Sequence, residues 1–431
     1  MKRSSLYIAL ALAGLCSAPA LADTTAITGG TVYTLGTAGK IEHGTVIIKD
    51  GKIAAVGPNL AVPAGAKVVD ATGKMVTPGI FDPNGAFGVD EVDQVTETQD
   101  GQLASTRYSA AFDPTEGINP RSMLIPVNRI EGVTRSVVGA SNANSVIGGL
   151  GSIISLNGVE GYVLKDPAAF FVTLGEGGKK LAGTARSGSL LVLREAFQDA
   201  KDFGANRAAY DKAGRHSYSL SRLDLEALQP VLKGAVPVVA QVDRASDIEA
   251  AIKLAAEFKL KLVVSGGAEA WMVADELAKA QVPVILNPTR DLPEAFESLG
   301  ATLDDAARLQ KAGVIVAFET YDSHKSWNVK QDAGIAVANG LPWLEAIKAI
   351  TLNPARIYGM DKSVGTLEAG KDADVVVWSG DPLELSTFAD AVFIRGQAVP
   401  MTSRQTELRD RYMPYVKPNA PALPPAYPVQ K

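Results

Sequence analysis

Short runs in which apolar and polar residues alternate occupy the beginning of the chain, from residue 28 to residue 76. Such alternation is typical of strands that bury one face. Between two of these runs, Asp50-Gly51 predicts a tight hairpin, because both central positions of a type I′ turn need positive φ. The region is therefore predicted to form a small β-unit. Its expected strands cover residues 31–35, 46–49, 52–56 and 67–70.

Longer apolar runs rich in β-branched residues begin at residue 237 and alternate with amphipathic segments. Ser246 and Glu249 fit a capping box at the start of the first expected helix. Continuous apolar strands that alternate with helices indicate a parallel sheet covered on both faces. The expected strands cover 237–242, 261–265, 282–287 and 314–320, and the expected helices cover 246–259, 269–280, 302–312 and 331–339.

Weaker strand patterns extend this series toward the N-terminus, at 80–81, 134–138 and 152–156. The barrel region then has the size of eight β/α units. After a helix expected at 343–350, β-type patterns return at 374–378 and 391–395. Because neither β-rich end is long enough to close a core alone, the two ends are predicted to pair.

The predicted fold is therefore α/β: a (β/α)8 TIM-like barrel with a small discontinuous β-sandwich built from both ends of the chain. The expected boundaries are 23–78 and 361–405 for the two parts of the sandwich and 79–360 for the barrel. Residues 406–431 form a Pro-rich tail, expected to be extended or disordered from Pro414 onward.

The first 22 residues have the pattern of a cleaved secretory signal. Lys2 and Arg3 precede an apolar run at 6–16, and Ala20-Leu21-Ala22 supplies a small-x-small cleavage site. The alternative is a buried N-terminal helix. The apolar run is too short to span a bilayer, and no later segment is long and apolar enough to do so. A periplasmic or secreted protein is predicted. Removal of the signal also removes Cys16, which suits an oxidising compartment.

Composition narrows the chemistry further. The 431 residues include 42 Lys and Arg against 47 Asp and Glu, one Cys and three His. The net charge of −5 argues against a nucleic-acid partner, which normally requires a basic surface. One cysteine excludes zinc fingers, disulfide frameworks and iron–sulfur clusters, which need several. His43 and His216 are interpreted as surface residues.

Two long motifs resemble a known family. Residues 73–82, Gly-Lys-Met-Val-Thr-Pro-Gly-Ile-Phe-Asp, look like the start of the barrel in metal-dependent amidohydrolases related to imidazolonepropionase. Residues 349–355 and 365–374 are similar to that family's return from barrel to sandwich. The segments 91–99 and 132–151 resemble its secreted branch. The resemblance covers nearly the whole mature chain and implies the same fold.

The family holds one or two divalent metals such as zinc at the C-terminal mouth of the barrel. Its ligands are His-x-His on the first strand, single His residues after the fifth and sixth strands, and an Asp after the eighth. The resemblance places these positions on residues without imidazole in this chain: Asn84 and Ala86, Gln241, Gly266, and Thr320 or, with a shifted loop, Asp322.

Zinc prefers imidazole ligands, so no metal cofactor is expected at these positions. The residues that remain near the expected mouth are mainly carboxylates. They offer oxygen ligands to Ca²⁺ or Mg²⁺ or, alternatively, form salt bridges and helix caps. The pair Asp322 and His324, after the last barrel strand, is the first candidate for acid–base catalysis. The full set is Asp82, Asp243, Glu269, Glu319, Asp322 and His324.

Two further segments have competing interpretations. The glycine run at 148–151 lacks the Lys-Ser/Thr ending of a phosphate loop and is expected to form a tight loop at the barrel mouth. The acidic stretch at 90–100 lies in a long loop after the first strand. Long loops on this face often contact ligands or partners, whereas a solvated charged loop is the alternative.

Two functions remain. In the first, the protein has lost metal-dependent hydrolysis and serves as a binding protein for a small-molecule or peptide-like ligand, or as the partner subunit of an intact homologue or of itself. In the second, it is an active hydrolase of carbon–nitrogen bonds with an atypical metal site or no metal.

Overall fold

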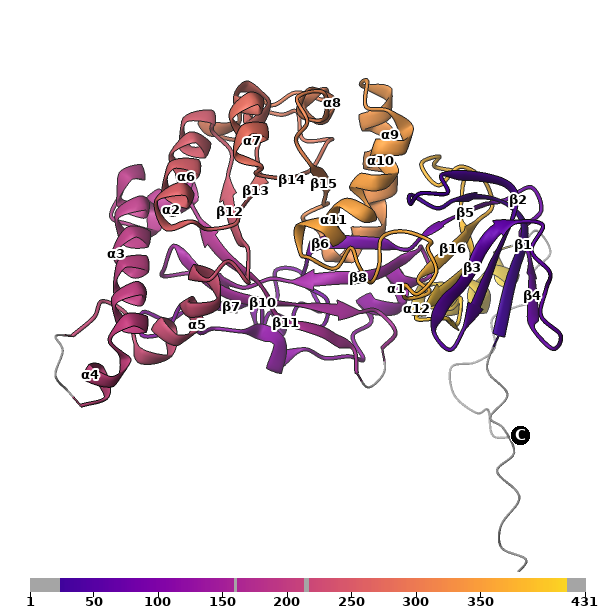
Figure 1. Ribbon diagram of the computed structural model, residues 1–431, viewed down its shortest axis with the longest axis horizontal. Helices are drawn as coiled ribbons and strands as arrows, with labels where there is room; N and C mark the ends of the chain where they lie inside the picture. Colours follow the sequence, from indigo (N-terminus) through magenta and orange to yellow (C-terminus); the bar gives the residue numbers. More distant parts are fainter. Residues whose placement is uncertain (1–23, 159–160, 213–216, 417–431) are drawn as a thin grey trace, which may run out of the picture.

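The computed structural model describes residues 24–158, 161–212 and 217–416. The predicted signal at 1–22, His216 and the tail after residue 416 lie outside the described residues. Figure 1 shows a larger unit of strands and helices beside a smaller sheet, which contains strands from both ends of the chain.

The smaller sheet joins β1 to β5 with β16 to β18, so the two β-rich ends pair as predicted. The turn after β2 has the positive φ expected of it, 50° at Asp50 and 79° at Gly51. A separate apolar core, with Val32, Val46 and Val375 in it, packs within this unit. The arrangement as a sandwich stays a prediction. The strands are β1 (Thr24–Tyr33), β2 (Lys40–Lys49), β3 (Lys52–Pro58), β4 (Lys67–Asp70), β5 (Met75–Pro78), β16 (Val375–Trp378), β17 (Ala389–Ile394) and β18 (Gln397–Ala398).

The larger sheet has eight strands, whose first and last members, β6 and β15, lie in contact without a ladder of hydrogen bonds. It is therefore a nearly closed barrel, as a TIM-like fold requires. In spatial order the strands are β6 (Ile80–Gly85), β8 (Val133–Val138), β10 (Ile147–Ser155), β11 (Val163–Thr173), β12 (Val238–Val242), β13 (Leu262–Gly266), β14 (Val284–Leu286) and β15 (Val316–Phe318).

One strand departs from the predicted (β/α)8 pattern. β10 pairs antiparallel with both β8 and β11, whereas every other pair in this sheet is parallel. The connections on either side of β10 are short, and their described residues form no helix. An antiparallel neighbour needs only a tight turn, whereas a parallel one needs a crossover.

The glycine run at 148–151 lies inside β10, so its prediction as a loop is wrong. Gly149 has a φ of 132°, and a Cβ on it would come within 2.4 Å of the Phe112 carbonyl oxygen. A Cβ on Gly151 would come within 2.5 Å of the Val138 carbonyl oxygen. These glycines allow the backbone of β10 to lie against its neighbours.

Helices cover the strands that run in parallel, as the sequence predicts for the C-terminal part of the barrel. In Figure 1, α6, α7, α8 and α9 lie outside β12 to β15. The helices are α1 (Leu124–Arg129), α2 (Gly175–Leu181), α3 (Arg186–Ala205), α4 (Arg207–Asp211), α5 (Arg222–Leu232), α6 (Ala245–Phe258), α7 (Ala274–Ala280), α8 (Asp305–Lys311), α9 (Val329–Ala338), α10 (Trp343–Ala349), α11 (Leu352–Ile357) and α12 (Arg404–Tyr412). Short 3-10 helices include η2 (Pro114–Gly117), η3 (Ala270–Val273) and η5 (Ser323–Asn328).

One local prediction at a helix start needs correction. The capping box of Ser246 and Glu249 does not form, because α6 begins one residue earlier and its N-cap, Arg244, makes no side-chain cap. Instead, Glu269 accepts a hydrogen bond from the backbone N–H of Ala245 at 3.0 Å. α12 occupies 404–412, with a capping box between Ser403 and Thr406, and ends before the residues that are predicted to be extended from Pro414 onward.

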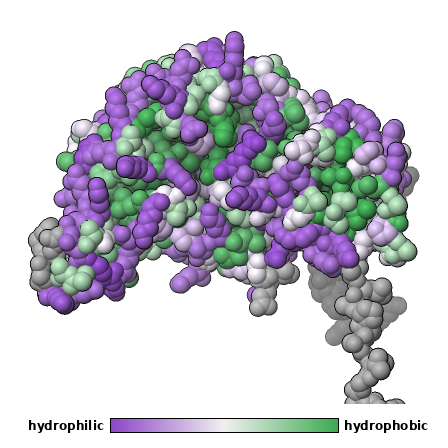
Figure 2. All heavy atoms as spheres, in the orientation of Figure 1, coloured by the Kyte–Doolittle hydropathy of each residue, from purple (hydrophilic) through white to green (hydrophobic). Residues whose placement is uncertain are grey.

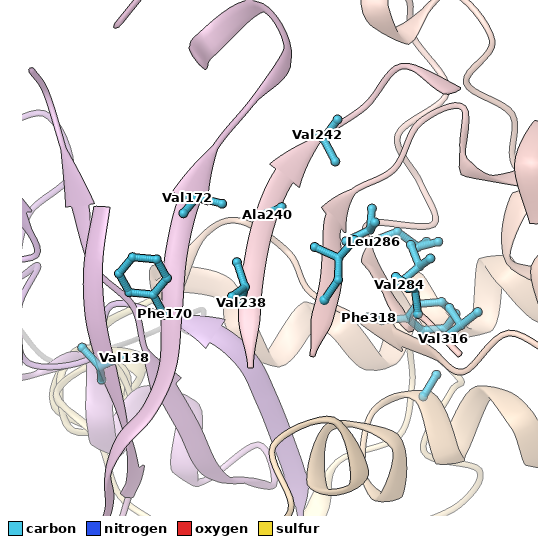
Figure 3. Packing of buried hydrophobic residues seen from close by; sticks show 14 of the residues in the cluster. Val138, Phe170, Val172, Val238, Ala240, Val242, Val284, Leu286, Val316 and Phe318 are labelled. Atoms are coloured by element: carbon cyan, nitrogen blue, oxygen red, sulfur yellow. The ribbon is translucent and has the colours of Figure 1, made fainter. Parts of the chain in front are cut away.

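The barrel strands alternate between an outer and an inner face. Phe170, Val238 and Phe318, labelled in Figure 3, belong to the cluster that packs the strands against the helices. Their sequence neighbours Phe171, Val239 and Ala317 belong to a second cluster inside the barrel, together with Val263 and Ile285 from β13 and β14. Period-two alternation then places the side chains of residues 241, 265 and 319 inside, where strands β12, β13 and β15 end.

The outer surface mixes polar and apolar residues. On the face in Figure 2, purple hydrophilic residues lie between green patches over the barrel and over the smaller sheet. Within the described ranges, no helix is both long and apolar enough to cross a bilayer.

Candidate functional site

A cavity of about 470 Å³ lies at the C-terminal mouth of the barrel. Its lining is mainly uncharged and polar, with Asp90 as the charged member. Phe171, Val89, Val172 and Val239 give it an apolar wall. The polar side chains come from four barrel strands, from the short strands β7 (Gln102–Leu103) and β9 (Ser141–Asn142), and from the loops after β6 and β15. They are Asn84, Asp90, Gln99, Gln102, Ser141, Thr173, Gln241, Ser265, Tyr321 and Ser323.

The inward side chains at the strand ends form one hydrogen-bonded group. Ser265 Oγ lies 2.9 Å from Glu319 Oε1 and 3.2 Å from Gln241 Oε1. β12 and β13 pair with Gln241 opposite Ser265, which explains why these two side chains meet. Asn84 and Tyr321 also interact with the Glu319 carboxyl group.

At two of the predicted ligand positions, the side chain that faces the barrel interior belongs to the residue one position earlier in the chain. On β13 the inward side chain belongs to Ser265, whereas Gly266 has a φ of 97° and ends the strand. A Cβ on Gly266 would lie 2.6 Å from Asp243 Oδ1 and 2.9 Å from Gln241 Nε2. After β15 the inward side chain belongs to Glu319 rather than Thr320, whose hydroxyl bonds instead to the backbone of Asp322. An acidic group therefore persists at the end of the eighth strand.

Glu319 is the most completely buried acid of the group, with 1% of its surface exposed. Burial raises the pKa of its carboxyl group to about 7, although hydrogen bonds from Ser265, Tyr321 and Asn84 act in the opposite direction. Oε2 has no hydrogen-bond partner of good geometry among the described residues. Glu319 does not itself line the cavity but lies behind the residues that do.

Asp82 is a second buried acid near Glu319. Its Oδ2 accepts a hydrogen bond from Ser326 Oγ at 2.6 Å, and its Oδ1 accepts one from the backbone N–H of Asn84 at 3.0 Å. Burial raises the pKa of Asp82 despite both bonds. The charge of Asp82 in turn raises the pKa of Glu319. Burial therefore disfavours the charged form of both acids.

Asp243 and Glu269 have structural partners. Asp243 Oδ1 lies 3.5 Å from Arg290 Nη1 and accepts a hydrogen bond from the backbone of Ala268 at 3.2 Å. Burial raises the pKa of Asp243, and Arg290 partly offsets this rise. Glu269 holds the start of α6 through Ala245. These contacts agree with the predicted alternative of salt bridges and caps.

Asp322 and His324 lie side by side but outside the cavity lining. Asp322 Oδ1 accepts a hydrogen bond from the backbone N–H of His324 at 2.8 Å, which caps η5. The His324 ring is 3.6 Å from Asp322 through Nδ1 and 3.3 Å from the Glu91 carbonyl oxygen through Nε2. The pair therefore ties the last barrel loop to the acidic loop.

Tyr321 is a site residue that the sequence analysis does not include. Its φ of 56° is unusual for a residue with a side chain, and 42% of its surface is exposed. The hydroxyl end nevertheless lies near Glu319 and Asp243, and burial raises its pKa well above the usual value. Tyr321 and Gln241 also line a neighbouring cavity of about 450 Å³ that contains Arg290.

The side chains at the mouth do not fit the metal centre of the resembled family. Ala86 and Gly266 have no donor atom, Asn84 and Gln241 offer neutral amides, and Ser265 offers a hydroxyl. Zinc sites need deprotonated or imidazole ligands, whereas burial disfavours the charged form of Glu319. In the described part of the chain, no three His, Cys, Asp or Glu side chains are grouped closely enough to hold a metal ion.

The sequence contains a recognisable pattern for some of the site residues, but not for all of them. Ser265 follows from strict alternation once strand β13 is placed, as does Glu319, which the sequence already predicts, once β15 is placed. Phe171 and Thr173 belong to β11, where Pro167 interrupts an apolar run and hides the strand. Gln99 and Gln102 reach the cavity from a loop without a periodic pattern, so nothing in the sequence indicates their position.

The nearly closed barrel and the site at its mouth define an amidohydrolase-type scaffold. A family model described as "Amidohydrolase family" matches residues 203–400. The crystal structure of an amidohydrolase from Thermotoga maritima MSB8 superposes with a TM-score of 0.79 at 29% identity, over 88% of this chain and 100% of that one.

Sequence relatives agree with this class. Amidohydrolase tasK of Hapsidospora irregularis is 26% identical over 88% of this chain, which spans only 42% of that protein. Dihydroorotase of Pelotomaculum thermopropionicum is 25% identical over 88% of this chain and 94% of its own length. Matches to proteins named imidazolonepropionase are shorter, one covering 11% of this chain. Together, these findings show that the chain is similar to members of the amidohydrolase superfamily.

Proposed function

We propose that this protein is a non-catalytic binding member of its superfamily, exported from the cytoplasm, in which a neutral polar cavity has replaced the metal centre. The observation that carries the proposal is the set of inward side chains at the strand ends. Asn84, Gln241 and Ser265 present amides and a hydroxyl where the resembled family has imidazoles. Such groups bind a polar ligand through hydrogen bonds and are poor ligands for zinc.

The test measures metal content in purified protein after exposure to zinc, manganese or iron and removal of free ions. We expect far less than one ion per chain by elemental analysis. Stoichiometric, tightly held metal would overturn the proposal. Two double variants provide a matched control. Gln241→His with Ser265→His places two imidazoles inward and should increase zinc retention, whereas Gln241→His with Gly266→His should not, because Gly266 has a left-handed backbone and no free space.

A second role within this proposal is that of partner subunit to an intact homologue. The barrel and the smaller sheet retain the architecture of the superfamily, so surfaces for such pairing are present. Native mass spectrometry of the protein isolated from its own compartment tests this role. A hetero-oligomer with a homologous chain is expected, and a monomer or homo-oligomer alone would contradict it.

An active hydrolase of carbon–nitrogen bonds is the second candidate. It is favoured by one observation, the persistence of Glu319 with a pKa of about 7 behind Ser265. A carboxyl group that titrates near neutrality suits general acid–base catalysis. Turnover of dipeptides, N-acyl amino acids or cyclic amides that Glu319→Gln abolishes would support this candidate. No turnover with any of these substrates supports the binding protein.

A further inference from the structure

The acidic loop brings one carboxylate into the cavity without giving it a full set of partners. Asp90 lines the cavity, and its Oδ1 is buried with no hydrogen-bond partner among the described residues. A buried acceptor without a donor carries a free-energy cost that a donor from a ligand removes.

Neighbouring charges favour a positive group at this place. Glu91, Asp93 and Asp322 lie close enough to Asp90 to interact with it electrostatically, and His324 is the basic side chain that opposes them. Lys325 is turned toward Asp322, with its Nζ 4.0 Å from Asp322 Oδ2. Glu91 is held in place by Asn119 and Ser122, at 2.8 and 2.9 Å. This side of the mouth therefore carries negative potential.

The rest of the cavity suits the amide groups and the side chain of a peptide-like ligand. Asn84, Gln99, Gln102 and Gln241 each offer both a donor and an acceptor, as an amide backbone does. Phe171, with Val89, Val172 and Val239, forms an apolar wall against which a side chain can pack. The volume of about 470 Å³ lies within the range of small-molecule pockets.

We propose that the cavity binds a short peptide or amino-acid amide through its protonated amino group, and that Asp90 accepts the hydrogen bond from this group. This inference rests on the proposed binding function and adds the class of ligand to it. It assigns a role in recognition to the acidic loop, through Asp90. The remaining polar side chains then satisfy the amide groups of the ligand.

The test compares two probes that differ only at the amino group: glycyl-L-leucinamide and its N-acetyl derivative. Isothermal titration calorimetry at neutral pH and low salt should show the free amine bound at least about tenfold more tightly, as expected for a charge-assisted hydrogen bond. Asp90→Asn should reduce the preference to less than about threefold. Glu97→Gln, on the same loop but outside the cavity lining and not among the charges that act on Asp90, should retain it.

The outcomes separate this inference from the proposed function. Equal or tighter binding of the acetylated probe overturns the amine inference but leaves a binding protein. Cleavage of either probe overturns the non-catalytic proposal, while a preference for the free amine would still support Asp90. Absence of binding by both probes at about 10 mM overturns the inference for this ligand class. The comparison of the two probes on the wild-type protein tests the inference about the amino group even if a variant fails to fold.

Discussion

The two halves of the barrel are built in different ways. The parallel half, β12 to β15, repeats strand and helix, and its outer face packs against α6, α8 and α9. The antiparallel half, β8, β10 and β11, has hairpin connections, and β10 is covered by the segment around η2, where Leu150 N–H bonds to Phe112 O at 2.7 Å. The parallel half depends on a repeated sequence pattern of strand and helix, whereas the antiparallel half depends on individual close contacts between residues. Single substitutions should therefore act most strongly in the antiparallel half.

The largest effect is expected at Arg135, on β8. Its side chain is 1% exposed and pairs with Asp374 at 2.5 Å and Asp372 at 2.6 Å, which join the barrel to the smaller sheet. Arg135→Met removes the charged partner of the buried Asp374 carboxylate, which keeps only the backbone N–H of Arg395, whereas Asp372 keeps Lys52. The change should lower the free energy of unfolding by about 3 to 5 kcal/mol. Urea denaturation measures the loss.

The control for Arg135 is Arg194→Met, because Arg194 forms an exposed pair with Glu257 at 2.9 Å between α3 and α6. Its loss should cost less than about 1 kcal/mol. Similar losses of unfolding free energy for the two variants would contradict the proposed difference between buried and exposed ion pairs. They would also show that the contact of Arg135 with the smaller sheet is not important for stability.

The next effect is expected at Gly149, on β10. Gly149→Ala combines an unfavourable φ of 132° with a clash against the Phe112 carbonyl, 2.4 Å from the added Cβ. The loss should be about 3 kcal/mol, measured by thermal or urea unfolding. Gly313→Ala, before β15, is the matched control: its φ is 90°, but no atom lies within 4 Å of the added Cβ. This variant should lose only about 1 kcal/mol. Equal losses would show that strain, not close packing, dominates at Gly149.

A third effect depends on pH and belongs to the parallel half. The pKa of Glu319 is raised from 4.5 to about 7, so between these values the folded protein retains a proton that the unfolded chain has lost. The resulting penalty grows as pH rises through this window and reaches at most about 3 kcal/mol above pH 7. Glu319→Gln should therefore stabilise the protein by about 1 to 3 kcal/mol at pH 8 and have little effect near pH 4.5.

Unfolding curves for Glu319→Gln at both pH values check this prediction. Glu257→Gln, which alters an exposed carboxylate, should show no such gain at pH 8. A loss of stability for Glu319→Gln at pH 8 would show that the folded protein uses the charged carboxylate, as an ion site would require.

The smallest effect is expected at Ser221, the N-cap of α5. Its Oγ accepts a hydrogen bond from the Asp224 backbone at 3.2 Å, and Asp224 in turn receives bonds from Ser109 and Ala111 of the segment that covers the antiparallel half. Ser221→Ala should cost about 1 kcal/mol by thermal unfolding. Ser246→Ala, at the start of α6, should have almost no effect, because Ser246 makes no cap. A larger loss of stability for Ser246→Ala would show that the predicted capping box does form.

Sequence prediction succeeds in the parallel half because each apolar strand there is followed by a helix with its own period. It fails for β11, where Pro167 divides the strand, and for β10, whose glycines resemble a loop. It also omits α3, although Leu193, Ala196, Phe197 and Ala200 repeat with a helical period and are buried. That omission was avoidable, whereas the reversal of β10 depends on contacts with segments distant along the chain.

For the candidate site, the sequence alone determines that imidazoles are absent from the predicted ligand positions, since only three His occur in the chain. Only the tertiary structure decides that Ser265 and Glu319, rather than Gly266 and Thr320, face the barrel interior. In a strand, an error of one residue reverses the face of every side chain, so this assignment needs the observed packing. Burial of Glu319 and the unpartnered Asp90 oxygen likewise arise from distant segments meeting at the mouth, which local patterns do not encode.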